Sequence, residues 1–247
     1  MGYFDARGII LHRRNLFEND QEVILLTERG GLAVRAPHAR GSQKTYCGRL
    51  EAPNRVHMRL YRARPDSFWT LTSVELENVY SELLHRDDLR YHLWPLLSLF
   101  RDLFPEGEKP GSCLPRLVKA FDYLQKEYFP PELVVDRLLI NIARETGIAH
   151  SLQQCSSCGA ESSKKWRLFP ETGLLCHKCS PMLSEREYPV SDSVVELYRK
   201  LFNLSWADVV SCSFNPETLV ELEQLMYRFF HYHFDISLKT LKIRNLL

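Results

Sequence analysis

Four cysteines in the second half of the chain have the spacing of a metal-binding site. Two residues lie between Cys155 and Cys158, two lie between Cys176 and Cys179, and seventeen residues separate the pairs. A two-residue gap lets one turn present two sulfur atoms to one ion, and Zn²⁺ takes four thiolates in a tetrahedron. The pattern predicts one structural zinc ion, in a closed site with no position for a substrate. An iron site of the rubredoxin type and a redox-active cysteine pair are the alternatives.

The segment between the two cysteine pairs must bring them together. Residues 166–169 and 173–175 are short apolar runs, and we expect them to form two strands of a hairpin. The other three of the seven cysteines, Cys47, Cys113 and Cys212, are scattered and fit buried apolar positions. An odd cysteine count without a secretion signal favours a reducing compartment. No apolar run reaches the length of a membrane span, so we expect a soluble, cytoplasmic, nucleoid-associated protein.

Charge is distributed unevenly along the chain. The formal net charge of the 247 residues is only +1. Residues 1–64 nevertheless hold twelve Lys and Arg against six acidic residues, so this segment carries +6 and the remainder −5. A basic module followed by a mildly acidic body favours a polyanion such as nucleic acid as ligand. Arginines that serve only solubility are the alternative.

Two stretches of the basic module combine cations with aromatic rings. In residues 55–62, apolar side chains alternate with arginine, histidine and tyrosine, which predicts a strand with a cationic outer face. The connection from Pro37 to Pro53 is a cationic loop, a composition that suits phosphate contacts and base stacking. A surface loop without a ligand is the alternative. The candidate nucleic-acid contacts are Arg35, Arg40, Lys44, Tyr46, Arg55, Arg59 and Tyr61.

The elements that position these side chains are predicted to be strands. Short β-prone runs occur at residues 9–11, 23–26, 32–34, 55–62 and 68–71, and Gly30-Gly31 predicts a hairpin turn between the second and third. Five strands in about 72 residues, with a long third connection, are typical of an OB-fold barrel. An SH3-like barrel fits this pattern nearly as well.

The period of the apolar residues becomes helical after the fifth strand. Thr72 and Glu75 form a capping-box pattern, and Leu76, Val79 and Leu83 follow at helical spacing. We therefore expect an α+β protein, with an OB-fold barrel followed by an α-helical domain that carries a four-cysteine zinc-ribbon insertion. The expected division is 1–72 for the barrel, 73–150 and 185–247 for the two parts of the helical domain, and 151–184 for the zinc module.

Motifs for the common catalytic sites are absent from the sequence. It contains no GxxxxGK[ST] loop, no GxGxxG after a strand, no GxSxG and no HExxH. His231 and His233 lie two apart in a helical stretch and therefore point in different directions, which is poor geometry for sharing a metal. Non-enzymatic function is the expectation.

Three stretches of the sequence match the pattern of a known family. Residues 8–11 and 18–30 combine an aliphatic strand, an acidic turn and the segment Leu25-Leu26-Thr27-Glu28-Arg29-Gly30. Residues 138–159 lead from a helix into the first cysteine pair, and residues 169–179 contain the second pair. In these stretches, and in the order of its modules, the chain resembles the RecO family of bacterial recombination mediators.

The resemblance implies a protein that binds single- and double-stranded DNA and anneals complementary strands. It implies RecR as a partner, and a role in loading RecA on DNA that is coated by single-stranded-DNA-binding protein. After the third strand the family has Gly-Ala followed by basic residues, whereas residues 36–41 here read Ala-Pro-His-Ala-Arg-Gly. The loop contacts therefore rest on composition alone. A zinc-ribbon RNA-binding protein and a protein-interaction scaffold are the alternative functions.

Overall fold

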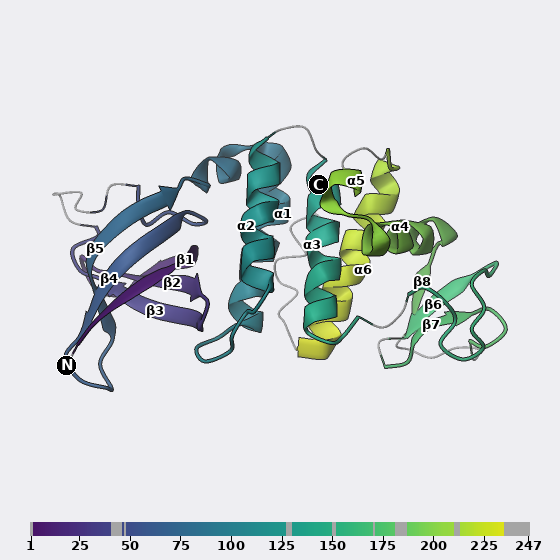
Figure 1. Cartoon of the computed structure of the whole chain (residues 1–247), viewed down its shortest axis with the longest axis horizontal. Coiled ribbons are helices and arrows are strands. Elements are labelled where there is room, and N and C mark those ends of the chain that lie inside the picture. The colour runs from purple at the N-terminus through teal and green to yellow at the C-terminus, as the bar shows by residue number, and fades with distance from the viewer. Residues whose placement is uncertain are drawn as a thin grey trace. The chain divides into compact units, whose positions relative to one another are not determined.

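The chain is divided into two compact units, Met1–Phe121 and Asp122–Leu247. The computed structural model describes residues 2–40, 46, 48–126, 130–149, 152–169, 171–180, 187–209 and 213–234. In chain order (Figure 1) the elements are β1 Gly2–Asn15, β2 Gln21–Thr27, β3 Gly30–Ala36, β4 Arg55–Arg62, β5 Trp69–Asn78, the 3₁₀ helix η1 Ser81–His85, α1 Asp87–Leu103, α2 Cys113–Gln125, α3 Pro131–Glu145, β6 Trp166–Phe169, β7 Gly173–Cys176, β8 Tyr188–Val190, α4 Asp192–Asn203, α5 Trp206–Val209 and α6 Pro216–Phe234.

The first five strands close into a barrel with the strand order β1-β2-β3-β5-β4. β4 pairs antiparallel with both β1 and β5, and a short parallel pairing of β3 with β5 completes the circle. This Greek-key connectivity is that of an OB-fold and excludes the SH3-like alternative. Alternation along β4 is as predicted, because Val56, Met58 and Leu60 are fully buried inside the barrel.

β1 is much longer than the three-residue apolar run that predicted it. Its second half pairs with β2 and its first half with β4, and the register with β2 shifts between Ile10 and His12. Gly8 lies where the neighbouring strand approaches most closely, since a Cβ there would be only 2.0 Å from the Leu26 carbonyl oxygen. One strand therefore contributes to both sides of the barrel.

The hairpin between β2 and β3 turns two residues earlier than Gly30-Gly31, so this prediction was wrong. Thr27 pairs directly with Gly30, and the turn consists of Glu28 and Arg29. The two glycines serve a different need. A Cβ at Gly30 would lie 2.7 Å from two backbone oxygens of the segment after α1, and the Gly31 N–H donates to the Phe104 carbonyl at 2.8 Å. Close backbone approach, rather than the turn, requires glycine here.

The helix predicted to begin at Thr72 was also wrong, because β5 continues to Asn78. The strand therefore runs six residues past the expected end of the barrel at residue 72. Leu71 and Val74 point into the barrel, and the strand keeps its antiparallel pairing with β4 as far as Asn78. Tertiary pairing outweighs a local capping pattern here, and η1 and α1 follow it.

The second unit combines helices with a small sheet. α3 packs against α6 and α4, and the buried faces of these three helices are mainly apolar. The Ser191 hydroxyl accepts a hydrogen bond from the Val194 N–H and caps α4. β6 pairs with β7 as predicted and also with β8, which leads directly into α4. Among the described residues, no helix is both long and apolar enough to cross a membrane.

Candidate nucleic-acid interface and metal centre

Side chains from all five strands form one row on the outside of the barrel. Directly paired positions point to the same side of a sheet, so the strand register places these residues next to one another. Arg14 pairs with Glu22, Glu22 with Arg35, and Arg35 with Thr70. Thr70 pairs with Tyr61, and Tyr61 with Tyr3. We call this set the outer row. It consists of Arg14, Glu22, Arg35, Thr70, Tyr61 and Tyr3.

The tyrosine end of the outer row carries an exposed aromatic pair with a cation above it. The rings of Tyr3 and Tyr61 lie 5.3 Å apart, and Tyr3 is 64% exposed. The Arg59 guanidinium lies 5.0 Å from the centre of the Tyr3 ring. Among the described residues Arg59 has no carboxylate partner, so its charge is available to a ligand. This end can stack a base and bind a phosphate within a few ångströms.

A second aromatic pair closes the adjacent end of the barrel. The rings of Phe4 and Trp69 lie 5.4 Å apart. The Arg62 guanidinium lies 4.4 Å from the Trp69 ring and that of Arg29 lies 5.2 Å from the Phe4 ring. None of these four residues was among the predicted contacts, since Phe4 lies in a part of β1 outside the predicted run and Arg29 lies in the turn between β2 and β3. An arginine near each aromatic is the only local signal.

The other end of the outer row is tied together by a buried acid. Asp20 accepts a hydrogen bond from the Arg35 Nε at 2.7 Å and another from the His38 N–H at 2.9 Å. The His38 N–H, with Arg35, holds the pKa of the Asp20 carboxyl below its usual range despite its burial. The Arg35 guanidinium also lies 5.5 Å from the exposed Phe17 ring. Arg35 is therefore oriented by Asp20 and partly neutralised by it.

Arg40 and Tyr46 belong to the same neighbourhood. The Arg40 N–H donates to the Asn19 carbonyl at 3.0 Å, and the Arg40 side chain is exposed. Burial, with the Asp20 charge as a smaller contribution, raises the pKa of the Tyr46 hydroxyl. Lys44 lies outside the described residues.

Arg55 stands apart from the other predicted contacts. It lies at the opposite end of β4 from Tyr61, and its Nε is 2.9 Å from a carboxylate oxygen of Glu77. The other oxygen of Glu77 lies 3.1 Å from the Nε of Arg7. The structure thus brings Arg35, Arg59 and Tyr61 onto or beside one row, with Arg40 and Tyr46 near Asp20. It places Arg55 in a separate ion-paired cluster.

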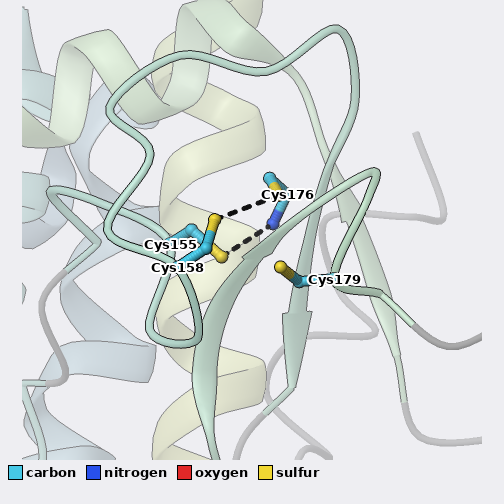
Figure 2. A group of neighbouring side chains, drawn as sticks. All are labelled: Cys155, Cys158, Cys176 and Cys179. Carbon is cyan, nitrogen blue, oxygen red and sulfur yellow. Dashed lines mark hydrogen bonds between the residues drawn. The ribbon is translucent and has the colours of Figure 1, made fainter.

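The four predicted metal ligands converge on one point in the second unit. Their sulfur atoms all lie within 4.8 Å of one another, and the Cys158 and Cys176 sulfurs are 3.7 Å apart. Figure 2 shows Cys155 and Cys158 on one turn facing Cys176 and Cys179 on the other. A tetrahedral ion with metal–sulfur bonds of about 2.3 Å requires sulfur separations of about 3.8 Å. The described geometry fits that requirement.

Backbone hydrogen bonds stabilise the thiolate forms of Cys155 and Cys176. Burial alone would raise the pKa of the Cys155 thiol, but N–H groups of Cys176, Cys158 and Ser157 lower it to about 6. The Cys176 N–H is 3.4 Å from the Cys155 sulfur (Figure 2). Such N–H donors stabilise thiolate ligands around a metal ion. The donor set therefore suits a cation that prefers sulfur, such as Zn²⁺.

The sheet of β6, β7 and β8 is attached to the helices of its own unit. Arg199 on α4 donates to the Gln153 carbonyl, and its guanidinium lies 5.8 Å from the Trp166 ring. At the other side Tyr232 on α6 donates to Glu171 at 2.6 Å. Contacts with α4 and α6 thus hold the segment that carries the cysteine turns. With four sulfurs filling the coordination shell, the centre can brace the fold but has no open position for catalysis.

Comparison with known proteins gives both units a common identity. Residues 1–80 match the family described as Recombination protein O N terminal, and residues 93–242 match Recombination protein O C terminal. The chain is 26% identical to the DNA repair protein RecO of Moorella thermoacetica, over 97% of this chain and 89% of the relative. It is 22% identical to that of Alkaliphilus metalliredigens, over 96% and 97% of the two chains. The RecO protein of Thermobifida fusca is 24% identical, over 98% of both. The resemblance noted in the sequence is thus confirmed along nearly the whole chain, which belongs to the RecO family of DNA repair proteins.

Proposed function

We propose that this chain is a non-enzymatic recombination mediator that binds single- and double-stranded DNA and anneals complementary strands. With RecR, it would help load RecA on DNA coated by single-stranded-DNA-binding protein. The observation that carries the DNA-binding part is the outer row, in which the exposed Tyr3 ring and the half-buried Tyr61 ring lie beside the available charge of Arg59. The named partners follow from the family.

Binding on this surface would combine two physical contributions. Arginine side chains that neutralise phosphates release condensed counterions, so affinity falls as salt rises. Aromatic rings stack on any exposed base, which contributes about 1 to 3 kcal/mol per base without reading its identity. Arg35, Arg40, Lys44 and Arg59 are the proposed phosphate contacts, and Arg55 is a weaker one because it is paired with Glu77. The proposed stacking residues are Tyr46, Tyr61 and Tyr3. Two strands bound to one cationic surface repel each other less, which would favour annealing.

In this proposal the segments outside the barrel have structural and partner-binding roles. We assign DNA contact to the barrel, which ends at Asn78, support and partner contact to the helices that follow it, and local bracing to the cysteine module 151–184. Zn²⁺ held by Cys155, Cys158, Cys176 and Cys179 would supply structural cross-linking only. This function requires a cytoplasmic protein that is associated with the nucleoid.

A salt titration of oligonucleotide binding tests the proposal. The full chain is mixed with a labelled single strand and a labelled duplex between about 50 and 200 mM salt, and binding is followed by fluorescence anisotropy. We expect affinity to fall steeply with salt and to change little with base sequence. The Y3S/Y61S double variant should bind single strands about tenfold more weakly, whereas the matched Tyr123→Ser variant on α2 should bind normally.

Three results would contradict the proposal. Binding that is independent of salt would exclude phosphate neutralisation as its source. A strong preference for RNA over single-stranded DNA of the same sequence would favour the zinc-ribbon RNA-binding alternative. A scaffold that contacts no nucleic acid would show no binding at any salt concentration.

A further inference from the structure

A cavity in the first unit lies beside the outer row but is separate from it. Its volume is about 610 Å³, within the usual range of small-molecule sites. It is bounded by the second half of β1, the residues before β4, η1 and the first half of α1. The lining residues are His12, Arg13, Glu51, Ala52, Ser81, Leu84, His85, Arg90 and Trp94.

The lining combines one flat aromatic surface with groups that bind anions. Trp94 is 40% exposed although it lies on a helix whose neighbouring residues are almost all buried. Leu84 and Ala52 extend the apolar surface, while Arg13 and Arg90 contribute guanidinium groups. An indole and two guanidiniums around one cavity match a planar ring that carries a phosphate.

Neither arginine is committed to a strong partner. Arg13 donates to Glu51 at 2.7 Å, and both side chains are more than a third exposed. Arg90 lies 3.2 Å from Asp87, whose side chain is 87% exposed. Exposed ion pairs of this kind contribute less than about 1 kcal/mol. An incoming phosphate can therefore compete for both guanidiniums at small cost.

His12 adds a hydrogen-bonding group without adding charge. Burial lowers the pKa of the His12 imidazole, and the charges of Arg101 and Arg14 lower it further. The ring is therefore neutral at neutral pH and offers one donor and one acceptor. Ser81 on η1 and the second imidazole, His85, complete the polar part of the lining.

The cavity is adjacent to the path that the proposed function gives to a DNA strand. His12 lies two residues from Arg14 on β1, and Arg14 is the last member of the outer row. Two residues of a strand span about 7 Å, so the cavity borders the Arg14 end of the outer row. A DNA strand bound near Arg14 could therefore place a nucleotide in the cavity.

We propose that this cavity binds one nucleotide unit of a DNA strand. The base stacks on Trp94 and the phosphate is held by Arg13 and Arg90, with Leu84 and Ala52 against the edge of the base. The identification of DNA as the source of the nucleotide rests on the proposed function. Binding of the nucleotide itself rests only on the chemistry of the cavity.

A fluorescent nucleotide tests this directly on the full chain. The probe is 2-aminopurine deoxyriboside 5′-monophosphate, whose emission is quenched when the base stacks on an aromatic ring. We expect saturable quenching by the unmodified chain and at least tenfold weaker binding in Trp94→Ala. Trp94→Phe, which keeps an aromatic face, should recover most of the affinity. The same nucleoside without its phosphate should bind several-fold more weakly.

Charge variants separate the phosphate contact from a general effect of charge. Arg90→Ala should weaken nucleotide binding about tenfold. Lys119→Ala removes an exposed cation from α2 in the same unit and should leave binding unchanged. Circular dichroism of each variant checks that the fold is retained. Unaltered binding in both Trp94→Ala and Arg90→Ala, or no quenching by the unmodified chain at millimolar nucleotide, would overturn the proposal.

The same variants distinguish this inference from the proposed function. The Y3S/Y61S variant should lose affinity for long single strands and still bind the mononucleotide. Trp94→Ala should lose the mononucleotide and keep the salt-dependent binding of duplex DNA. If only long DNA binds, the proposed function stands and the nucleotide cavity is rejected; if only the mononucleotide binds, the cavity stands and the source of its ligand is not DNA.

Discussion

The side chain of Asn54 holds the backbone of Tyr80 in place across the end of the barrel. The Asn54 Oδ1 accepts hydrogen bonds of 2.9 Å from the N–H groups of both Tyr80 and Ser81, where η1 begins. Its Nδ2 donates to the Gly48 carbonyl at 3.1 Å, and Asn54 is only 1% exposed. One buried amide thus links the loop before β4 to the segment that leads into α1.

Replacing this amide should destabilise the first unit. Asn54→Ala leaves two backbone N–H groups and one carbonyl without their partner, and we expect a loss of about 2 to 3 kcal/mol in the free energy of unfolding. Urea denaturation measures it. Asn19→Ala, which changes an exposed asparagine in the turn after β1, is the control and should have little effect. Equal stability of the two variants would show that the Asn54 hydrogen bonds do not support the fold.

The Asp20 carboxylate should make the free energy of unfolding depend on pH in the acidic range. Its pKa is lowered in the folded chain, so its stabilisation is present above the unfolded-state value of about 3.9 and is lost as the pH falls through the folded-state pKa. The stability difference between the unmodified chain and Asp20→Asn should therefore be largest near pH 7 and shrink toward pH 3. Urea unfolding at several pH values measures this. The control is Asp66→Asn in the exposed loop before β5, which should show no such trend.

The two β4 arginines should differ in their effect on DNA binding. Arg59 has an uncommitted charge beside Tyr3, whereas Arg55 shares Glu77 with Arg7. Arg59→Ala should weaken single-strand binding several-fold and reduce the slope of log affinity against log salt by about 0.7, the value of one phosphate contact. Arg55→Ala should change both quantities less. The reverse order would move the proposed binding surface to the other end of β4.

Loss of one thiolate should release the metal. We expect about one zinc ion per chain by mass spectrometry of the purified protein, and none in Cys176→Ser. The free energy of metal binding supports the local fold, so proteolysis of this variant should begin near residues 152–180. Cys113→Ala, which removes a buried cysteine of α2, should retain the ion. A full complement of metal in a variant lacking both Cys155 and Cys176 would refute the assignment.

Local patterns predicted the parts of this molecule that depend on a few neighbouring residues. The spacing of Cys155, Cys158, Cys176 and Cys179 was sufficient to predict that their sulfurs meet, because each pair is presented by one turn. Alternation predicted the whole of β4 with its bounds, since period two is visible in eight residues. By contrast, residues 72–78 satisfy both a helical and an extended pattern, and only pairing with β4 decides between them.

The composition of the outer row depends on register and could not be read from the sequence. Arg35, Tyr61 and Tyr3 are neighbours only because the barrel closes through β5. The acids that neutralise predicted contacts, Asp20 for Arg35 and Glu77 for Arg55, are distant along the chain. A count of arginines therefore overestimates the charge that a ligand meets. The Trp94 cavity likewise needs four separate segments to come together.

The two ion pairs of Glu77 make the charge on the barrel surface asymmetric. By pairing with both Arg7 and Arg55, this carboxylate lowers the net charge of the cluster from +2 to +1 and weakens the positive potential on its flank of the barrel. Under the proposed function, a polyanion would therefore be attracted more strongly toward Tyr3 and Arg59. Glu77 would thus help to select where a strand binds without contacting it.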